Sequence, residues 1–140
     1  MNLLVSLLFV VTAYTPGINP KMNGDFIDAY GFPVDRYTVA CGAKYWAHVF
    51  IFEDVPGSQI RVCSDSVLGG EYNNHLDLAF VEEENRYKEA LKFGRKNMKV
   101  SVITPDNFLK ARGLNVPKTN KEKIEKIKRI LRDEERFRVN

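Results

Sequence analysis

Short runs of apolar and β-branched residues, each closed by a glycine, proline or asparagine turn, recur along most of this chain. Runs of this length and composition predict β-strands rather than helices. We expect strands over residues 3–15, 37–41, 48–52, 59–63, 76–80 and 98–103, with the third and fourth paired as a hairpin. Before the last strand, residues 82–93 have helical spacing and stop at Gly94. Short strands with one inserted helix suit a small closed barrel, so we expect a mainly β fold.

The end of the chain follows a different pattern. A short helix over residues 106–112 stops at Gly113, and a capping box at Thr119–Glu122 opens a longer helix. That helix is densely charged and carries a narrow apolar stripe at Ile124, Ile127 and Leu131. The stripe either lies on the barrel or binds a partner helix. We therefore expect a barrel domain over residues 1–104 and a helical C-terminal extension over residues 105–140.

Composition excludes several classes of protein. With 140 residues, 44% hydrophobic and 28% charged, the chain has the composition of an ordinary folded domain. Its net charge of +3 is small, and much of the positive charge lies beside acidic residues near the C-terminus, so we expect no nucleic-acid partner. The two histidines and two cysteines lack metal-ligand spacing. We expect no metal site and no cofactor.

The first eleven residues include an apolar run, Leu3–Val11, that allows two interpretations. The run is long enough for the apolar region of a signal peptide and too short to span a membrane. No lysine or arginine precedes it, and no small-x-small cleavage site follows at the right distance. We therefore favour a buried first strand over a signal peptide, and expect no membrane span.

Two cysteines, Cys41 and Cys63, allow one disulfide. Both lie at the ends of expected strands. A disulfide is reasonable if the domain works outside the cytoplasm. Two buried free thiols are the simpler interpretation, and we favour it.

Two aspartates, Asp65 and Asp77, stand twelve residues apart, each beside an expected strand. The segment between them is rich in turn residues and contains Gly69 and Gly70. Strands joined in this way can direct two carboxylates into one groove, where they are suited to acid–base chemistry on sugars. The alternative is ordinary turn chemistry, in which each carboxylate accepts hydrogen bonds from backbone amides.

Taken in order, these landmarks resemble the three-aspartate (3D) domain, a family related to the barrel of membrane-bound lytic transglycosylase A. The resemblance covers about residues 9–104. It is carried by Thr12-Ala13-Tyr14, Asp28-Ala29-Tyr30-Gly31, Val49-Phe50-Ile51, Asp65 with Gly69-Gly70, Asn74-His75-Leu76-Asp77-Leu78-Ala79-Phe80, Glu89–Lys96 and Lys99–Val102.

This resemblance implies a six-stranded double-psi β-barrel that cleaves peptidoglycan between N-acetylmuramic acid and N-acetylglucosamine and closes a 1,6-anhydro ring. In that chemistry one carboxyl acts first as acid and then as base, because the nucleophile belongs to the substrate. Asp77 is the residue implied for this role, with Asp65 nearby as the second catalytic carboxylate. The substrate-binding residues that we expect are Tyr14, Tyr30, Gly69, Gly70 and Asn74, with Trp46 as a weaker candidate.

The chain departs from the family at one important point. Where the family has the first of its three aspartates, this chain has Cys41 or Gly42, and the turn that follows is replaced by Ala43–Ala47. This departure is consistent with either of two outcomes: an enzyme whose active site is altered, or a barrel that has lost activity.

Two main hypotheses follow. The first is a peptidoglycan lytic transglycosylase that acts outside the cytoplasm at the bacterial wall, delivered by a route such as a phage tail. The second is a non-catalytic barrel, a structural (virion) or glycan-binding component that docks on other virion or wall proteins through residues 106–140. An expansin-like wall binder on the same fold is a third, weaker hypothesis.

Overall fold

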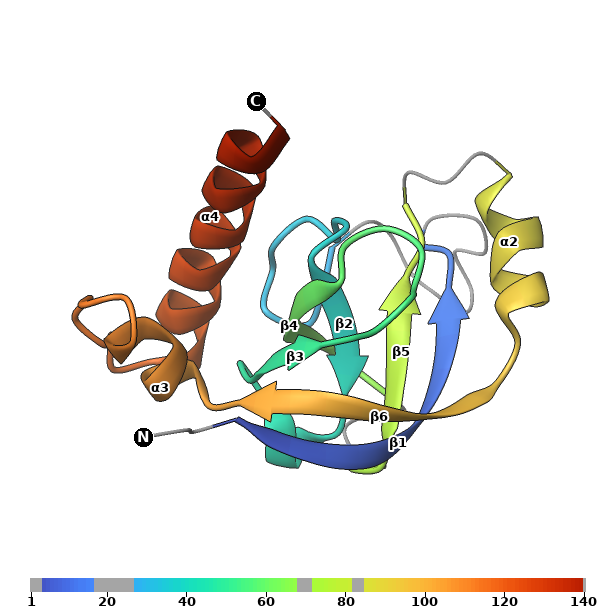
Figure 1. The fold of residues 1–140 in the computed structure, drawn as a ribbon, viewed down its shortest axis with the longest axis horizontal. Helices are drawn as coiled ribbons and strands as arrows, with labels where there is room; N and C mark the ends of the chain where they lie inside the picture. The colour runs from blue at the N-terminus through green and yellow to red at the C-terminus, as the bar shows by residue number, and fades with distance from the viewer. Residues whose placement is uncertain (1–3, 17–26, 68–71, 82–84, 140) are drawn as a thin grey trace.

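The computed structural model describes residues 4–16, 27–67, 72–81 and 85–139, and it shows a closed β-barrel with helices on two sides (Figure 1). A mainly β fold is therefore confirmed. The six strands of the barrel lie close to the expected ranges: β1 (Val5–Tyr14), β2 (Thr38–Cys41), β3 (Val49–Ile51), β4 (Ile60–Ser66), β5 (His75–Ala79) and β6 (Lys96–Ile103).

Around the barrel the strand order is β1-β5-β2-β4-β3-β6. Strands β3 and β4 form the expected antiparallel hairpin. Two pairs, β1 with β5 and β2 with β4, are parallel, and the remaining neighbours are antiparallel. Parallel neighbours cannot be joined by a tight turn, so the chain must cross the barrel between them. These crossings bring residues that are distant in sequence into one lateral row.

The first strand is present, but only its second half is buried as expected. Phe9 and Val11 lie in the core, whereas Val5 and Leu8 are 53% and 67% exposed. The reason lies in the pairing: β5 joins β1 only from Val10 onward, so the earlier part of β1 pairs with β6 alone.

The helices follow the sequence pattern closely. They are α2 (Arg86–Phe93), α3 (Pro105–Lys110) and α4 (Asn120–Val139), with a 3-10 turn η1 (Ala43–Tyr45) after β2. Gly94 ends α2 with a φ of 66°, which favours glycine. The expected helical residues 82–84 lie outside the described residues. Among the described residues, none of these helices combines the length and the apolarity needed to cross a membrane.

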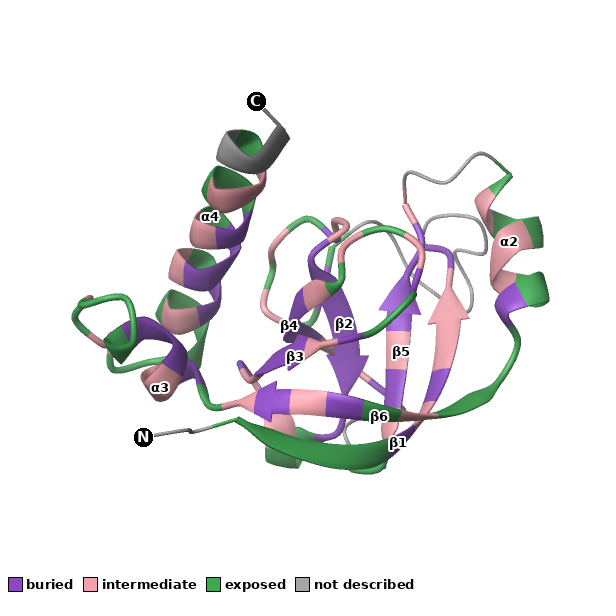
Figure 2. Cartoon of the chain, in the orientation of Figure 1, coloured by how far each residue is buried: buried purple, intermediate pink, exposed green. Residues whose placement is uncertain are grey.

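The extension packs on its own barrel. The three stripe residues of α4 are at most 2% exposed and share a core cluster with Val49, Val62 and the α3 residues Phe108 and Leu109. Figure 2 shows this buried face of α4 turned toward the barrel. Burial of each such side chain contributes about 1.5–3 kcal/mol relative to exposure. Of the two interpretations of the stripe, packing on the barrel is the one observed: the apolar side chains of α4 contact this chain and not a partner helix.

A buried lysine also fastens α4 to the barrel. Lys128 is 3% exposed, and its Nζ donates to Thr38 Oγ1 at 2.8 Å and to Asp28 Oδ2 at 3.3 Å. Pro33 O and Asp35 Oδ1 lie 3.4 and 3.7 Å from the same nitrogen. A buried ammonium needs this density of acceptors because leaving it unpaired would cost several kcal/mol.

The two cysteines form a disulfide, so the prediction of free thiols was wrong. The Cα atoms of Cys41 and Cys63 lie 5.9 Å apart, within the ordinary range for a disulfide. Parallel pairing of β2 with β4 brings the two residues together, Val39 facing Cys63 and Cys41 facing Ser66. Sequence alone did not reveal this pairing because it depends on a crossover rather than on a hairpin.

We expect replacement of both cysteines by alanine to lower the free energy of unfolding by about 3 kcal/mol, because the disulfide closes a loop in the unfolded chain. The two residues are separated by 22 positions. Urea denaturation of the oxidised wild type and the double variant measures this difference. Equal midpoints and slopes for the two proteins would contradict a stabilising disulfide.

Candidate active site

The two aspartates lie in one lateral row of the barrel. Thr12 on β1 faces Asp77 on β5, Asp77 faces Ala40 on β2, and Ala40 faces Asp65 on β4. Residues that face one another across paired strands project to the same side of the sheet. Neighbouring strands are about 4.8 Å apart, so the backbones of Asp65 and Asp77 are separated by about 10 Å.

A break in strand register aims Asp65 into this row. Val39 faces Cys63, but the next residue, Ala40, faces Asp65 rather than Ser64. The extra residue is a β-bulge, which turns the side chains that follow it to the other face. Without it, Asp65 would share the core-facing side of Cys63. The bulge therefore places the second carboxylate beside the first.

The Asp65 carboxylate accepts two hydrogen bonds from described residues. The Tyr14 hydroxyl donates to Oδ2 at 2.8 Å and the Ser66 amide to Oδ1 at 3.0 Å. The Ala29 backbone also acts to lower the Asp65 pKa. Burial raises the pKa of Asp65, whereas these donors act in the opposite direction. Burial, and then the Asp65 charge, raises the Tyr14 pKa well above its ordinary value. The phenol therefore stays protonated and can donate a hydrogen bond to Asp65.

Asp77 has a different environment. Its side chain is partly exposed, and the Thr12 hydroxyl donates to Oδ1 at 2.9 Å. Burial, opposed by that hydrogen bond and reinforced by the Asp65 charge, raises its pKa from 3.8 to about 6. Within the described part of the chain no backbone amide donates to this carboxyl. Asp77 therefore does not have the amide-capping role of a turn aspartate.

A short hydrogen-bonded chain connects Asp77 to His75. Thr12 Oγ1 lies 2.8 Å from His75 Nε2 as well as 2.9 Å from Asp77 Oδ1. A hydroxyl carries one proton, so the direction of the two bonds is coupled. When Asp77 is ionised, Thr12 donates to it and Nε2–H of His75 donates to Thr12. When Asp77 holds a proton, both bonds can reverse.

The two environments divide the roles of the carboxyls. Burial raises the pKa of both carboxyls, but the Tyr14 and Ser66 donors favour the ionised form of Asp65, whereas Asp77 has one donor and a neighbouring negative charge. Pairs of carboxyls pushed apart in this way are the usual basis for separate acid and base assignments. The row therefore places Asp77, a carboxyl biased toward its acid form, beside Asp65, a second carboxyl whose donors favour the ion.

The structure places the other expected site residues unevenly. Tyr14 reaches the carboxylates, but its hydroxyl is used to hold Asp65. The Tyr30 ring packs against Trp46, with centroids 5.1 Å apart. Asn74 is exposed in the turn before β5, where its carbonyl accepts from Val10 N at 2.9 Å. Gly69 and Gly70 lie outside the described residues.

A fully buried arginine, which the sequence did not reveal, links the strands that carry the site. The Arg61 guanidinium is 0% exposed and donates to four carbonyls. Nη1 bonds Thr38 O at 3.1 Å and Ala79 O at 2.8 Å, which ties β2 to the end of β5. Nε bonds Ser58 O at 3.0 Å and Nη2 bonds Pro56 O at 2.9 Å. The only sequence signal was a charged residue in an apolar strand.

The backbone at Gly42 is closely approached by the turn before β5. A Cβ built on Gly42 would lie 2.7 Å from Asn73 Cα and 2.7 Å from Tyr72 O. Backbone that close leaves no room for a side chain. The Asn73 side chain instead turns toward this corner and accepts from Lys44 N at 3.1 Å. The turn at residues 72–74 therefore occupies the space beside Gly42.

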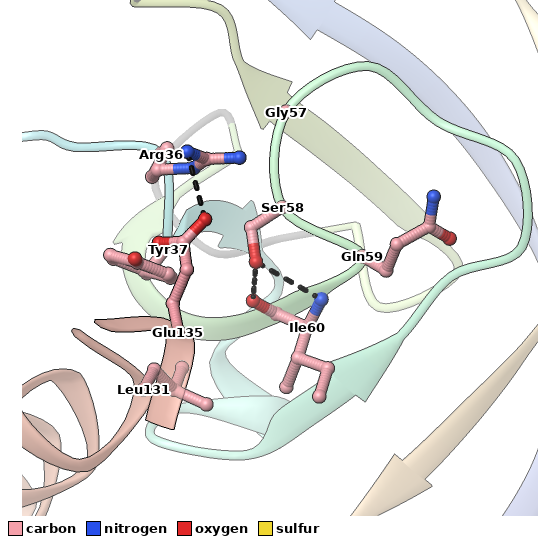
Figure 3. A pocket seen from close by; sticks show the side chains of 8 residues that line it. All are labelled: Arg36, Tyr37, Gly57, Ser58, Gln59, Ile60, Leu131 and Glu135. Atoms are coloured by element: carbon pink, nitrogen blue, oxygen red, sulfur yellow. Dashed lines mark hydrogen bonds and ion pairs between the residues drawn. The ribbon is translucent and has the colours of Figure 1, made fainter. Parts of the chain in front are cut away.

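Other features of the described structure are less suggestive of chemistry. Among the described residues, no group of three or more histidine, cysteine or carboxylate side chains could hold a metal ion. A hollow of about 150 Å³ lies between α4 and the loop before β4, and none of the expected site residues lines it. Figure 3 shows the side chains that do. An ion pair between Arg36 Nη1 and Glu135 Oε1, 2.9 Å long, crosses this hollow. We interpret this hollow as a gap in the packing between α4 and the barrel.

Comparison with known proteins adds no relative: no family model matches the chain, and neither does any curated protein.

Proposed function

We propose that this chain is a peptidoglycan lytic transglycosylase built on a 3D-type double-psi β-barrel. The observation that carries the proposal is the Asp77 carboxyl, partly exposed and with its pKa raised to about 6, in one row with the Asp65 carboxyl. A group that holds its proton near neutral pH and can also release it is suited to act first as acid and then as base.

In this mechanism the Asp77 carboxyl donates its proton to the glycosidic oxygen, and the N-acetylglucosamine leaving group departs. The positive charge that develops at C1 of the muramic acid is stabilised by the nearby Asp65 carboxylate. The Asp77 carboxylate then takes the proton from the C6 hydroxyl as that oxygen bonds to C1. The anhydro ring closes, the bond to the leaving sugar is broken, no water is consumed, and Asp77 is again an acid.

Two features of the fold support the proposal. The parallel pairs β1 with β5 and β2 with β4 in a closed six-stranded barrel are compatible with double-psi topology. The disulfide between Cys41 and Cys63 is compatible with work outside the cytoplasm, at the bacterial wall or on a virion, because such bonds persist in oxidising surroundings.

A non-catalytic barrel, serving as a structural or glycan-binding component, is the second candidate. The observation that favours it is the filled space at Gly42, which with Cys41 is one of the two positions where the resemblance implies a further aspartate. Because the apolar stripe of α4 is buried on the barrel, docking through residues 106–140 would use the charged outer face of that helix.

Digestion of purified peptidoglycan with the wild-type protein, followed by mass spectrometry, separates these candidates. We expect 1,6-anhydro-muropeptides, which are lighter by one water than the products of hydrolysis. Hydrolysed products would mean that water is the nucleophile and would contradict the transglycosylase. Absence of any release by a folded protein that still sediments with peptidoglycan would favour the glycan-binding candidate.

A further inference from the structure

A second hollow, with a volume of about 420 Å³, lies where the turn after β2 meets the beginnings of α3 and α4. Three separate segments of the chain build it, and it is open at the surface. The residues that matter for recognition are Lys44, Trp46, His48, Asp106, Asn120 and Lys123. Pockets that combine an aromatic surface with a few fixed polar groups are typical sites for small organic ligands.

Its aromatic part is Trp46, which is partly exposed. Tyr30 stands at right angles to it, with an interplanar angle of 84° and centroids 5.1 Å apart. A perpendicular pair leaves at least one face of the indole uncovered by the phenol. A sugar ring has an apolar face of C–H groups and a rim of hydroxyls, so a flat aromatic surface suits it.

The rim of the hollow is polar and partly fixed. Lys123 Nζ is paired with Asp106 Oδ1 at 2.8 Å, which holds α4 against the start of α3. His48 Nδ1 lies 3.0 Å from Trp46 O, and since a carbonyl only accepts, Nδ1 carries a proton there. The neutral ring then offers Nε2 as an acceptor. Lys44 is exposed at the edge.

Two hydrogen-bonded turns connect the hollow to the part of the barrel that carries the carboxylates. Asp28 Oδ1 accepts from the amides of Tyr30 and Phe32 at 2.9 and 3.0 Å, which fixes the turn whose Ala29 backbone acts on the Asp65 carboxyl. The same turn carries the Tyr30 ring to Trp46. On the other side, Lys44 N donates to Asn73 Oδ1 in the turn that leads into β5 and Asp77.

We propose that the Trp46 hollow is a distal subsite for a further N-acetylated sugar of the glycan strand whose bond Asp77 cleaves. This rests on the proposed function for the identity of the strand. The indole takes the apolar face of the sugar ring, and Lys44, His48 and Asn120 supply donors and an acceptor for its hydroxyl and amide groups. The enzyme then prefers long strands, because short ones cannot reach both places.

The chain contains a single tryptophan, so emission excited selectively from tryptophan rather than tyrosine reports on Trp46 alone. The Asp77→Asn variant, which does not turn over substrate, is titrated with a hexamer of N-acetylglucosamine. We expect a saturable change in Trp46 emission. Lys44→Glu in the same background is expected to weaken the titration about fivefold or more while keeping the reporter. An unchanged emission spectrum at concentrations where calorimetry detects hexamer binding would overturn the subsite.

Kinetics separate the subsite from the proposed function. With long peptidoglycan strands we expect Trp46→Ala to raise KM about tenfold with little change in kcat, because uniform binding is lost. Tyr87→Ala, which removes a 56% exposed aromatic side chain on α2, is the matched control and should leave KM unchanged. Trp46→Phe, which keeps a ring, should restore most of the affinity even if the alanine variant folds poorly.

The two ideas fail in different ways. Cleavage of long strands with the same KM in Trp46→Ala, Trp46→Phe and wild type would overturn the subsite and leave the transglycosylase standing. A saturable fluorescence response from a wild-type protein that releases no anhydro product would overturn the proposed activity and support the subsite.

Discussion

Replacement of Asp77 by asparagine is expected to lower the release of anhydro-muropeptides by about 10³-fold or more, close to the background rate. Proton transfer by a positioned group contributes about 10²–10⁴-fold to catalysis, and here one carboxyl supplies both transfers. Asparagine keeps the size and can still accept from Thr12 Oγ1, the donor that lies 2.9 Å from Asp77 Oδ1. Initial rates by mass spectrometry measure the loss.

The stability of Asp77→Asn serves as the control that this variant is folded. The Asp77 pKa is about 6 in the native state against 3.8 ordinarily, so the native state binds this proton more tightly than the unfolded chain. The contribution of the Asp77 proton to the free energy of unfolding is therefore fully present below about pH 4 and is lost as pH rises through about 6. Asp77→Asn lacks this loss and should be more stable at pH 7 by about 1–3 kcal/mol. Undiminished anhydro-product release by a stable variant would contradict the role of Asp77.

Replacement of Arg61 by methionine is expected to lower the free energy of unfolding by about 4 kcal/mol, a large part of the total for a domain of this size. The change leaves four carbonyls without their donor: Pro56 O, Ser58 O, Thr38 O and Ala79 O. Each unpaired buried acceptor costs about 1–3 kcal/mol, and methionine recovers only part of this by packing. Urea denaturation gives the difference.

The matched control is Arg129→Met on the outer face of α4. Arg129 is 65% exposed and pairs with Glu125 at 3.2 Å, one helical turn away. Exposed pairs of this kind contribute about 0.5 kcal/mol or less. Similar small effects for both arginines would mean that the Arg61 network does not hold β2 and β5 together as described.

The parts of the fold that could be predicted from sequence were the local ones. The alternation of residues 59–63 and the Gly57 turn before them identified the β3–β4 hairpin, and the helical spacing up to Gly94 identified α2. The stripe at Ile124 and Ile127 identified the buried face of α4. In each case periodicity of nearby residues decides which side faces the core.

What could not be predicted depends on crossovers and on single-residue shifts. The Cys41–Cys63 disulfide needs β2 and β4 to be parallel neighbours, and the bulge at Ser64 turns Asp65 by one residue. Sequence spacing carries no signal for either. Thr12 was noted only as part of a motif, although its hydroxyl bridges Asp77 and His75.

A carbon-13 NMR titration of the Asp77 carboxyl tests most directly whether this residue holds a proton where an acid catalyst needs one. We expect a midpoint of about 6 in the wild type. The midpoint should fall in Asp65→Asn, which removes the neighbouring charge, and rise in Thr12→Val, which removes the hydrogen bond to the carboxylate. A wild-type midpoint at the ordinary value of 3.8, unmoved by either substitution, would contradict the assignment of Asp77 as the acid.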